Sequence, residues 1–443
     1  MLGVSLGKAF NRKGLVMAEA ALKEKIVQAV AASFAAQTKF IADVVRIPSR
    51  RGREAPAQDL MAAAMAKRGL SVDRWKIEID DIKTMRGFSP VNVSYDDAWN
   101  VVGALRAAHP KGRSLILNGH IDVVPEGPLD MWTSPPYEPR VADGWLYGRG
   151  GGDMKAGLVS CLFALDALKA IGLCPTADVF VQSVVEEECT GNGALACLQR
   201  GYRADAALIP EPTNETYTSA QVGVMWFQVK VRGVPVHVLR ADAGANAIES
   251  AFRLIQALRG LEEEWNKRKM HDQHFADHHH PINFNVGKIA GGDWASSVPA
   301  WCEFDMRVGT FPDQDLAEAR REIEACIKQA ANKDPFLRNM APEIVYNGFQ
   351  AEGFVLKGAE EPLKVLDSAH RAIFGAALKP VASTGTADAR FFGLYADIPA
   401  IVYGPVAENI HGFDERVDLQ STLKVTQAMA VFIADWCGVE PIS

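Results

Sequence analysis

Histidines and acids gather in short motifs that follow apolar runs of the chain. GHID places His120 and Asp122 two residues apart, and LIPEPTN carries Glu211. VVEEECTGNGA sets three glutamates, 186–188, after another apolar run. Each motif alone has an ordinary interpretation: a hydrogen-bonded pair, a surface acid, a solvated charge run. Three carboxylates crowded beside a buried segment repel one another unless a positive charge lies among them, so a metal cluster explains the set best.

The glycine-rich stretch LYGRGGGDMKAG, residues 146–157, raises the question of a phosphate-binding loop. Such loops have the spacing GxGxxG or end in GK followed by serine or threonine, and this stretch has neither because Lys155 precedes an alanine. The glycines instead allow a tight bend that presents Asp153 just before a helix. A lone aspartate there is more often a helix cap. The late motif ENIHGFDERV adds His411.

Strand and helix patterns alternate along the first half of the chain. Apolar strand patterns cover 100–107, 114–124 and 177–188, and helical periodicity covers 24–45, 55–70 and 155–172. This alternation predicts an α/β fold with a mixed, mostly parallel sheet and helices on both faces. Chemistry in such sheets gathers beyond the carboxyl ends of the strands, where the histidine and glutamate motifs are expected.

The pattern changes near Val222. From there to about Asn347 the expected order is β-α-β-β-α-β, the signature of a ferredoxin-like α+β domain.

The domain boundaries begin with the N-terminus. A second methionine, Met17, precedes the first helical pattern, so we expect a loose N-terminal extension at 1–16, or an upstream start codon read as coding. The remaining boundaries are expected to give a first part of the catalytic domain at 17–221, an inserted dimerisation and lid domain at 222–347, and the rest of the catalytic domain at 348–443.

Composition excludes several classes of protein. The net charge of −7 argues against a general nucleic-acid binder. No run approaches the roughly 18 apolar residues of a membrane span. The N-terminus lacks the apolar region of a signal peptide. Seven scattered cysteines without a CxxC pair predict reduced thiols and a cytoplasmic protein.

The ordered set GHIDVVP, GRGGGDMKAG, EEECTGNGA, PEPT and HGFDERV resembles the M20 family of di-zinc metallohydrolases, which includes acetylornithine deacetylases and succinyl-diaminopimelate desuccinylases. The resemblance covers nearly the whole chain from about Glu24. It implies two divalent ions, zinc first, with manganese or cobalt as alternatives. The implied ligands are His120 and Glu211 for one ion, Glu188 and His411 for the other, and Asp153 as the bridge.

The resemblance also implies roles for the neighbours of these ligands. Glu187 is the expected general base, and Asp122 is expected to orient His120. A slip of one residue would make Glu187 the ligand and Glu186 the base. The family carries a cis peptide bond after the bridging aspartate, here between Asp153 and Met154.

In the family, the inserted domain forms a homodimer and closes over the substrate. His237 matches a histidine that stabilises the oxyanion, often in the neighbouring subunit's site. Arg307 is a candidate for gripping a substrate carboxylate, and Gly385 and Thr386 match the substrate loop. Ser296 stands where relatives commonly have asparagine, which puts the usual carboxylate contact in doubt.

The expected function is hydrolysis of the amide bond of an N-acyl amino acid or related small carboxylate amide, with no nucleic-acid or membrane partner. A dipeptidase or carboxypeptidase on the same scaffold is the nearest alternative. A non-catalytic ligand-binding homologue has no need of Glu187, and a dinucleotide oxidoreductase lacks its GxGxxG. The histidines at 271, 274 and 278–280 are interpreted as a solvated loop, with adventitious metal binding as the alternative.

Overall fold

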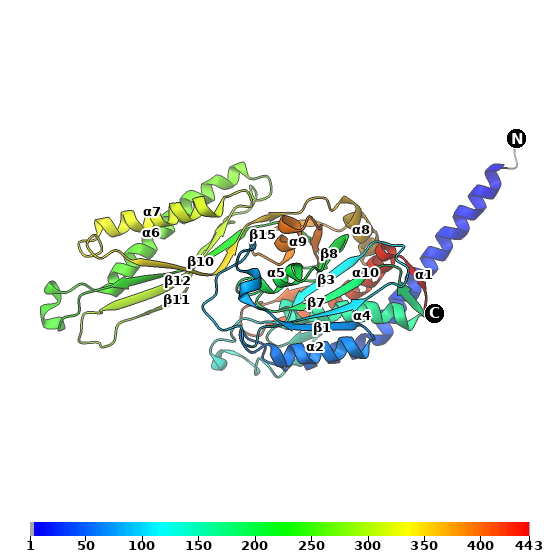
Figure 1. Ribbon diagram of the computed structural model, residues 1–443, viewed down its shortest axis with the longest axis horizontal. Coiled ribbons are helices and arrows are strands. Elements are labelled where there is room, and N and C mark those ends of the chain that lie inside the picture. Colours follow the sequence, from blue (N-terminus) through cyan, green and yellow to red (C-terminus); the bar gives the residue numbers. More distant parts are fainter. Residues whose placement is uncertain (1–3, 443) are drawn as a thin grey trace.

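The computed structural model describes the backbone of residues 4–442 and the side chains of residues 19–442. A larger lobe carries most of the helices, and a smaller, elongated lobe extends from one side of it (Figure 1). Each lobe has its own cluster of buried apolar side chains. The chain enters the smaller lobe once and returns to the larger one.

A six-stranded sheet forms the centre of the larger lobe. Its order is β1 (Ser71–Lys76), β2 (Trp99–Leu105), β7 (Val179–Val184), β3 (Leu115–His120), β8 (Ala206–Ile209) and β16 (Ala400–Val402). Strands β7, β3, β8 and β16 are parallel to one another, whereas β2 runs antiparallel to both β1 and β7. Every residue of β3 and β7 is buried, as expected for strands covered on both faces. The predicted mixed, mostly parallel sheet is confirmed.

Helices cover both faces of this sheet. On one face, Gly103 of β2 lies against Met65 of α2 (Ala55–Lys67). On the other, Asn100 of the same strand donates a hydrogen bond to the Gly193 carbonyl of α5 (Asn192–Gln199). Helix α4 (Ala156–Ala170) packs on the α2 face, where Gly119 meets its side chains. The further helices of this lobe are α3 (Ile79–Ile82), α8 (Glu360–Phe374), α9 (Ala389–Tyr395) and α10 (Leu419–Cys437).

Helix α1 (Val4–Val45) begins earlier than the sequence indicated. The stretch 4–16, expected to be loose, is helical and projects from the body of the molecule (Figure 1). Its Leu6, Lys8, Ala9, Arg12, Lys13 and Leu15 favour a helix, although Gly7 and Gly14 do not, and the segment continues the helix that follows it. Residues 1–3 of the expected extension lie outside the described residues.

The smaller lobe has the predicted β-α-β-β-α-β order. Its elements are β10 (Gly223–Arg232), α6 (Ala247–Lys267), β11 (Phe284–Gly291), β12 (Trp301–Thr310), α7 (Leu316–Lys333) and β13 (Glu343–Ala351). The antiparallel sheet order β11-β12-β10-β13 is that of a ferredoxin-like fold. Asn246 caps α6 by accepting hydrogen bonds from two amides, and the helix buries one apolar face. Strand β13 continues past Asn347 to Ala351.

Three small sheets complete the larger lobe. One joins β14 (Phe354–Val355), β9 (Tyr217–Gln221) and β15 (Pro380–Ser383). A second joins β17 (Ala407–Glu408), β18 (Arg416–Asp418), β5 (Trp145–Tyr147) and β4 (Arg140–Ala142). The third pairs β19 (Val439–Pro441) with β6 (Leu173–Pro175). Among the described residues, no helix is both long and apolar enough to cross a membrane.

Candidate metal centre and active site

The carboxyl ends of three parallel strands bring the predicted ligands together. His120 is the last residue of β3, Glu188 follows β7, and Glu211 follows β8. Asp153 comes from the turn Gly151–Lys155 that opens α4, and His411 comes from the loop between β17 and β18. Five side chains distant in sequence therefore meet at one edge of the sheet, as the strand-end argument predicts.

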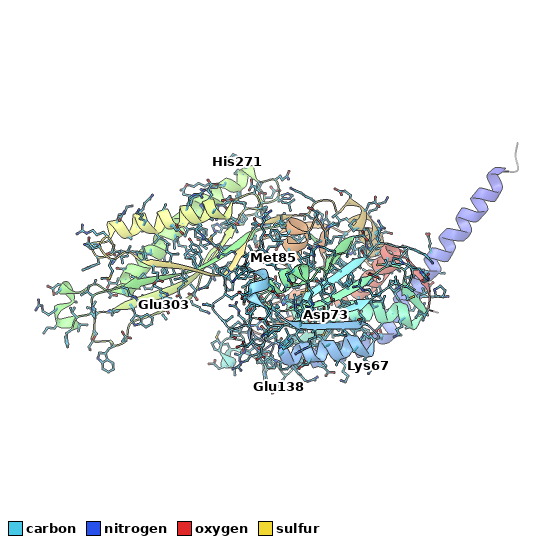
Figure 2. The ribbon with its side chains drawn as sticks, viewed as in Figure 1. Lys67, Asp73, Met85, Glu138, His271 and Glu303 are labelled. Carbon is cyan, nitrogen blue, oxygen red and sulfur yellow. The ribbon has the colours of Figure 1, made fainter. Side chains whose placement is uncertain are left out.

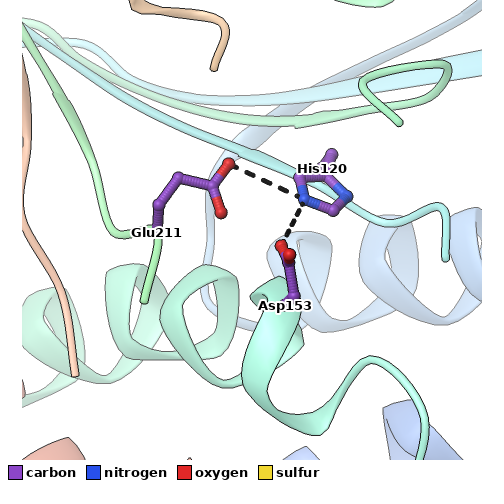
Figure 3. Close-up of side chains that lie close together, drawn as sticks. All are labelled: His120, Asp153 and Glu211. Atoms are coloured by element: carbon purple, nitrogen blue, oxygen red, sulfur yellow. Dashed lines mark hydrogen bonds and ion pairs between the residues drawn. The ribbon is translucent and has the colours of Figure 1, made fainter. Parts of the chain in front are cut away.

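The first group of ligating atoms surrounds His120. Its Nε2 lies 3.2 Å from Oδ1 of Asp153 and 3.7 Å from Oε1 of Glu211 (Figure 3). The Nδ1 atom of the same ring lies 2.9 Å from the carbonyl oxygen of Asp122. A carbonyl can only accept, so Nδ1 carries a proton, and Nε2 is the ring atom directed at the two carboxylates, where it could bind a cation.

The second group shares Asp153 with the first. His411 Nε2 lies 3.4 Å from Oδ2 of Asp153 and 3.1 Å from Oε2 of Glu188. Within each group of three residues, one ligating atom per residue lies within 4.8 Å of the others. One Asp153 oxygen faces each histidine, so the chain offers two adjacent sets of nitrogen and oxygen donors that fit a pair of divalent cations.

The charges of this cluster favour a cation. Burial, reinforced by neighbouring carboxylates, raises the pKa of Glu211 to about 8 and also raises the pKa of Glu188. Burial lowers the pKa of His411, but Glu188 and Asp153 outweigh it and raise the value to about 11. Protons thus offset part of the crowded negative charge in the metal-free chain. A divalent cation would take their place.

Glu187 lies beside the cluster without belonging to either group. Its Oε2 is 3.9 Å from Nε2 of His120, and burial raises its pKa well above the ordinary range. The third acid, Glu186, turns away and pairs with Arg51. This arrangement favours the register in which Glu188 is the ligand and Glu187 the base.

Asp122 has a different main contact from the one expected. Its carboxylate lies 3.6 Å from Nδ1 of His120, whereas its backbone carbonyl makes the hydrogen bond to that ring. The carboxylate accepts hydrogen bonds from the amides of Glu187, at 3.3 Å, and Glu188, at 3.1 Å. Asp122 therefore fixes the histidine through its backbone and the glutamate turn through its side chain.

Glu415 is a residue of the site that the sequence analysis missed. Its Oε1 accepts from the amides of Gly152 and Asp153, and its Oε2 accepts from Gly150 N and from the buried Arg149 guanidinium at 2.6 Å. One buried carboxylate thus holds the glycine-rich turn around the bridging aspartate. Its signal in the sequence was its place in HGFDERV, four residues after His411.

The glycine-rich turn has two further features. The peptide bond between Asp153 and Met154 is cis, as the resemblance implied. A Cβ atom at Gly157 would lie 1.9 Å from the carbonyl oxygen of Pro210, the residue before Glu211. Only glycine lets α4 begin directly against the strand end that carries Glu211.

The predicted substrate residues form a separate group at the junction of the lobes. Arg307 of β12 donates a hydrogen bond to the Thr384 carbonyl at 3.1 Å, next to Gly385. The Thr386 hydroxyl accepts from Gln221 Nε2, also at 3.1 Å. The Arg307 contact joins the smaller lobe to the predicted substrate loop, whereas the Thr386 contact ties that loop to β9 of the larger lobe.

His237 is exposed, and its interactions lie within the smaller lobe. Its Nδ1 accepts from the Leu239 amide at 3.1 Å, and its backbone forms a bridge with Ser297. The Val238 amide donates to the carbonyl of Ser296, the position where relatives commonly have asparagine. None of these contacts brings His237 into the cluster of this chain.

The histidine-rich segment belongs to the same lobe. His271 is exposed at the edge of that lobe (Figure 2). His280 lies 3.2 Å from a Glu262 oxygen, and Phe275 anchors the segment in the core. Among the described residues, these histidines form no third group that could hold a metal ion.

Comparison with known proteins gives a consistent result. The model of peptidase family M20/M25/M40 matches residues 116–435. An N-formyl-4-amino-5-aminomethyl-2-methylpyrimidine deformylase of Halalkalibacterium halodurans is 30% identical over 403 residues, covering 86% of this chain and 89% of the relative. The deformylase of the same name from Bacillus subtilis is 27% identical over 437 residues, covering 94% and 95%. A dipeptidase structure from Saccharomyces cerevisiae superposes with a TM-score of 0.78 at 14% identity, covering 94% of this chain and 98% of that one, which shows the shared fold. The chain belongs to peptidase family M20/M25/M40.

Proposed function

We propose that this amide-bond hydrolase is a deacylase that removes a small acyl group from an amine or amino acid with the help of two divalent ions. The observation that carries the proposal is the shared carboxylate of Asp153, which faces His120 with one oxygen and His411 with the other. The curated relatives, named as deformylases, support a small acyl group.

In the proposed mechanism Glu187 handles the proton. Bound divalent ions would polarise the amide carbonyl and make the attacking water more acidic. Glu187 takes the proton of that water and then gives it to the leaving amine. Its position suits both tasks, because its Oε2 lies 3.9 Å from Nε2 of His120, beside the ligand cluster and outside both groups. A protein that only bound a ligand would have no use for a buried carboxylate there.

The residues that would hold the ions are His120 and Glu211 for one, Glu188 and His411 for the other, and Asp153 for both. Imidazole and carboxylate donors suit zinc, and a carboxylate-rich pair also accepts manganese or cobalt. Zinc is the metal we propose.

We further propose that residues 222–347 form a dimerisation and lid domain. Strand β11 lies at an edge of its sheet, which leaves a ladder of backbone groups for a second copy. Apolar side chains are exposed on the same lobe, with Leu239 at 84%, Trp294 at 74% and Phe252 at 53%. A two-fold homodimer would cover such a surface and could carry His237 into the partner's site.

The proposed substrate contacts are Arg307, Gly385 and Thr386, which meet where the two lobes join. Ser296 supports a substrate without the carboxylate that relatives hold through asparagine, which agrees with the amine products of the named deformylases. The seven free cysteines support a cytoplasmic location.

An assay panel tests this proposal. The metal-loaded chain should release a primary amine from N-formyl, N-acetyl or N-succinyl amines or amino acids, and removal of the metal should stop the reaction. Zinc, manganese and cobalt are each loaded to identify the most active form. Cleavage of dipeptides alone would favour the dipeptidase alternative, and no cleavage by a chain holding both ions would refute the deacylase.

A further inference from the structure

The first glutamate of the acidic run is held by a buried network of its own. Glu186 is 2% exposed, and its carboxylate accepts hydrogen bonds from both Nε and Nη2 of Arg51. The Tyr95 hydroxyl donates to Oε2 at 2.6 Å, and the Thr190 hydroxyl donates to the same oxygen at 3.0 Å. Four donors therefore converge on a carboxylate that points away from the metal ligands.

Glu186 is also the residue on which the glutamate turn depends. Its φ of 68° lies in the left-handed region, which is unfavourable for a residue with a Cβ atom. Its carbonyl accepts hydrogen bonds from the amides of Thr190, at 2.9 Å, and Gly191, at 2.7 Å. Residues 187–188 lie between these anchor points. The direction in which their side chains leave the backbone is thus set by the conformation of Glu186.

The Tyr95 hydroxyl has a fixed direction. It accepts a hydrogen bond from Asn192 Nδ2 at 3.1 Å while donating to Glu186. Burial, together with the nearby Glu186 carboxylate, raises the pKa of Tyr95, so the hydroxyl keeps its proton. The segment that carries Tyr95 also touches the smaller lobe, because the Pro90 carbonyl accepts from the Gly348 amide at 2.8 Å.

We propose that Tyr95 and Arg51 are positioning residues, which act through Glu186 to hold Glu187 and Glu188 in their working orientations. This inference rests on the proposed function for the roles of the two later glutamates. Arg51 pairs with the buried Glu186 carboxylate through two nitrogen atoms, and Tyr95 selects one orientation of that carboxylate. Without the hydroxyl, the unfavourable backbone conformation loses a restraint, and the turn can relax.

The test compares Tyr95→Phe with Tyr202→Phe in the full chain. The control removes an equivalent contact, because the Tyr202 hydroxyl donates to Asp73 at 2.8 Å on another part of the larger lobe. Both variants are loaded with Co²⁺, and the visible absorption spectrum and the rate of Co²⁺ release to a chelator are measured. Tyr95→Phe should alter the spectrum and release one of the two ions about tenfold faster, as is typical when a partner of a ligand is lost.

Steady-state kinetics give the second measurement. On the best substrate from the panel above, Tyr95→Phe should lower kcat about tenfold and change KM by less than about twofold, because it displaces the base and a ligand and not the substrate contacts. Tyr202→Phe should leave both constants unchanged. A loss confined to KM, or equal losses in both variants, would overturn the positioning role.

Hydrogen exchange separates this inference from the proposed function. The amides of 187–191 should exchange faster in Tyr95→Phe than in Tyr202→Phe, in the metal-free chain as well. If the wild-type chain binds no Co²⁺ and cleaves no amide, the proposed function fails, and the exchange rates still decide whether Tyr95 holds the turn. If the amides of 187–191 in a folded Tyr95→Phe chain exchange at the same rates as in the wild-type chain, the inference is refuted. If Tyr95→Phe does not fold, the same measurements on Arg51→Lys decide the inference by the same outcomes.

Discussion

The backbone amide of Asp153 donates a hydrogen bond to Oε1 of Glu415 at 3.0 Å, across 262 residues of chain. The same oxygen also accepts from Gly152 N, so the residue that faces both histidines is held from behind by one carboxylate. Glu415→Gln keeps the shape but replaces one acceptor with an NH₂ group. We expect both metal ions to bind about 10- to 100-fold more weakly.

Chelator competition against the purified variant measures that loss. Glu408→Gln is the control, since Glu408 pairs with Arg416 at the surface. Wild-type metal affinity in a folded Glu415→Gln protein would show that the glycine-rich turn holds its shape without this carboxylate.

The metal content should follow the two groups of ligands. Wild-type chain purified without chelator should hold close to two divalent ions, and His120→Ala or His411→Ala should each lose about one. Asp153→Ala should lose both, because its two oxygens serve the two groups. Elemental analysis of each purified protein measures the number of bound ions per chain. An active enzyme without bound metal would refute the entire interpretation of the site.

Substitution of the general base, Glu187, should leave both metal ions bound. Glu187→Ala should retain both ions while turnover falls about 10²-fold or more, the scale of general acid–base catalysis. Glu188→Ala is the matched comparison and should lose one ion, because Glu188 lies 3.1 Å from His411. The reverse pattern, with the ion lost from Glu187→Ala, would move the register of the glutamate run by one residue.

The stability of the metal-free chain should fall as the pH rises from about 6.5 to 8. In this window the folded chain holds protons on Glu211, whose pKa is about 8 against 4.5, and on His411, whose pKa is about 11 against 6.5. The folded state therefore binds more protons than the unfolded state, and each excess proton lowers the free energy of unfolding by about 1.4 kcal/mol per pH unit. Thermal melts in excess chelator measure this, and Glu211→Gln should flatten the slope. A melting temperature that rises with pH would contradict the assignment.

The proposed dimer predicts rescue between two inactive variants. If His237 acts in the partner's site, mixing His237→Ala with Glu187→Ala under subunit exchange should restore up to about one quarter of wild-type activity. Half of the randomly exchanged dimers are then mixed, and each of these has one complete site. No recovery after demonstrated exchange would mean that His237 serves its own subunit or has no part in the reaction.

The place where most of the candidate ligands lie could be predicted from local patterns, whereas their division between two ions was implied only by the resemblance to the M20 family. His120, Glu188 and Glu211 follow apolar strands whose carboxyl ends meet in a parallel sheet, and Asp153 follows glycines that permit its bend. The alternation of strands and helices likewise predicted the sheet and the order of elements in the smaller lobe.

The contacts that hold these ligands could not be predicted in the same way. Glu415 reaches a turn 262 residues earlier, and Arg51 reaches Glu186 across 135 residues. Which buried acid meets which buried base depends on tertiary packing, and sequence spacing carries no record of it. For the same reason the sequence placed the carboxylate of Asp122 near His120, where it lies 3.6 Å from Nδ1, but did not indicate its hydrogen bonds from the amides of the glutamate turn.

The smaller lobe divides the larger lobe into two segments of sequence, and this division has a consequence for the order in which the chain is synthesised. Four of the five ligands precede the smaller lobe in the chain, and His411 and Glu415 follow it. A nascent chain that has just completed β13 carries His120 and the acids of the cluster, but it still lacks His411, Glu415 and the edge strand β16. The smaller lobe has its own core and can fold while the ribosome is still at work. The second group of ligands, which needs His411, can therefore be completed only in the last stage of translation, after all three residues of the first group have been made.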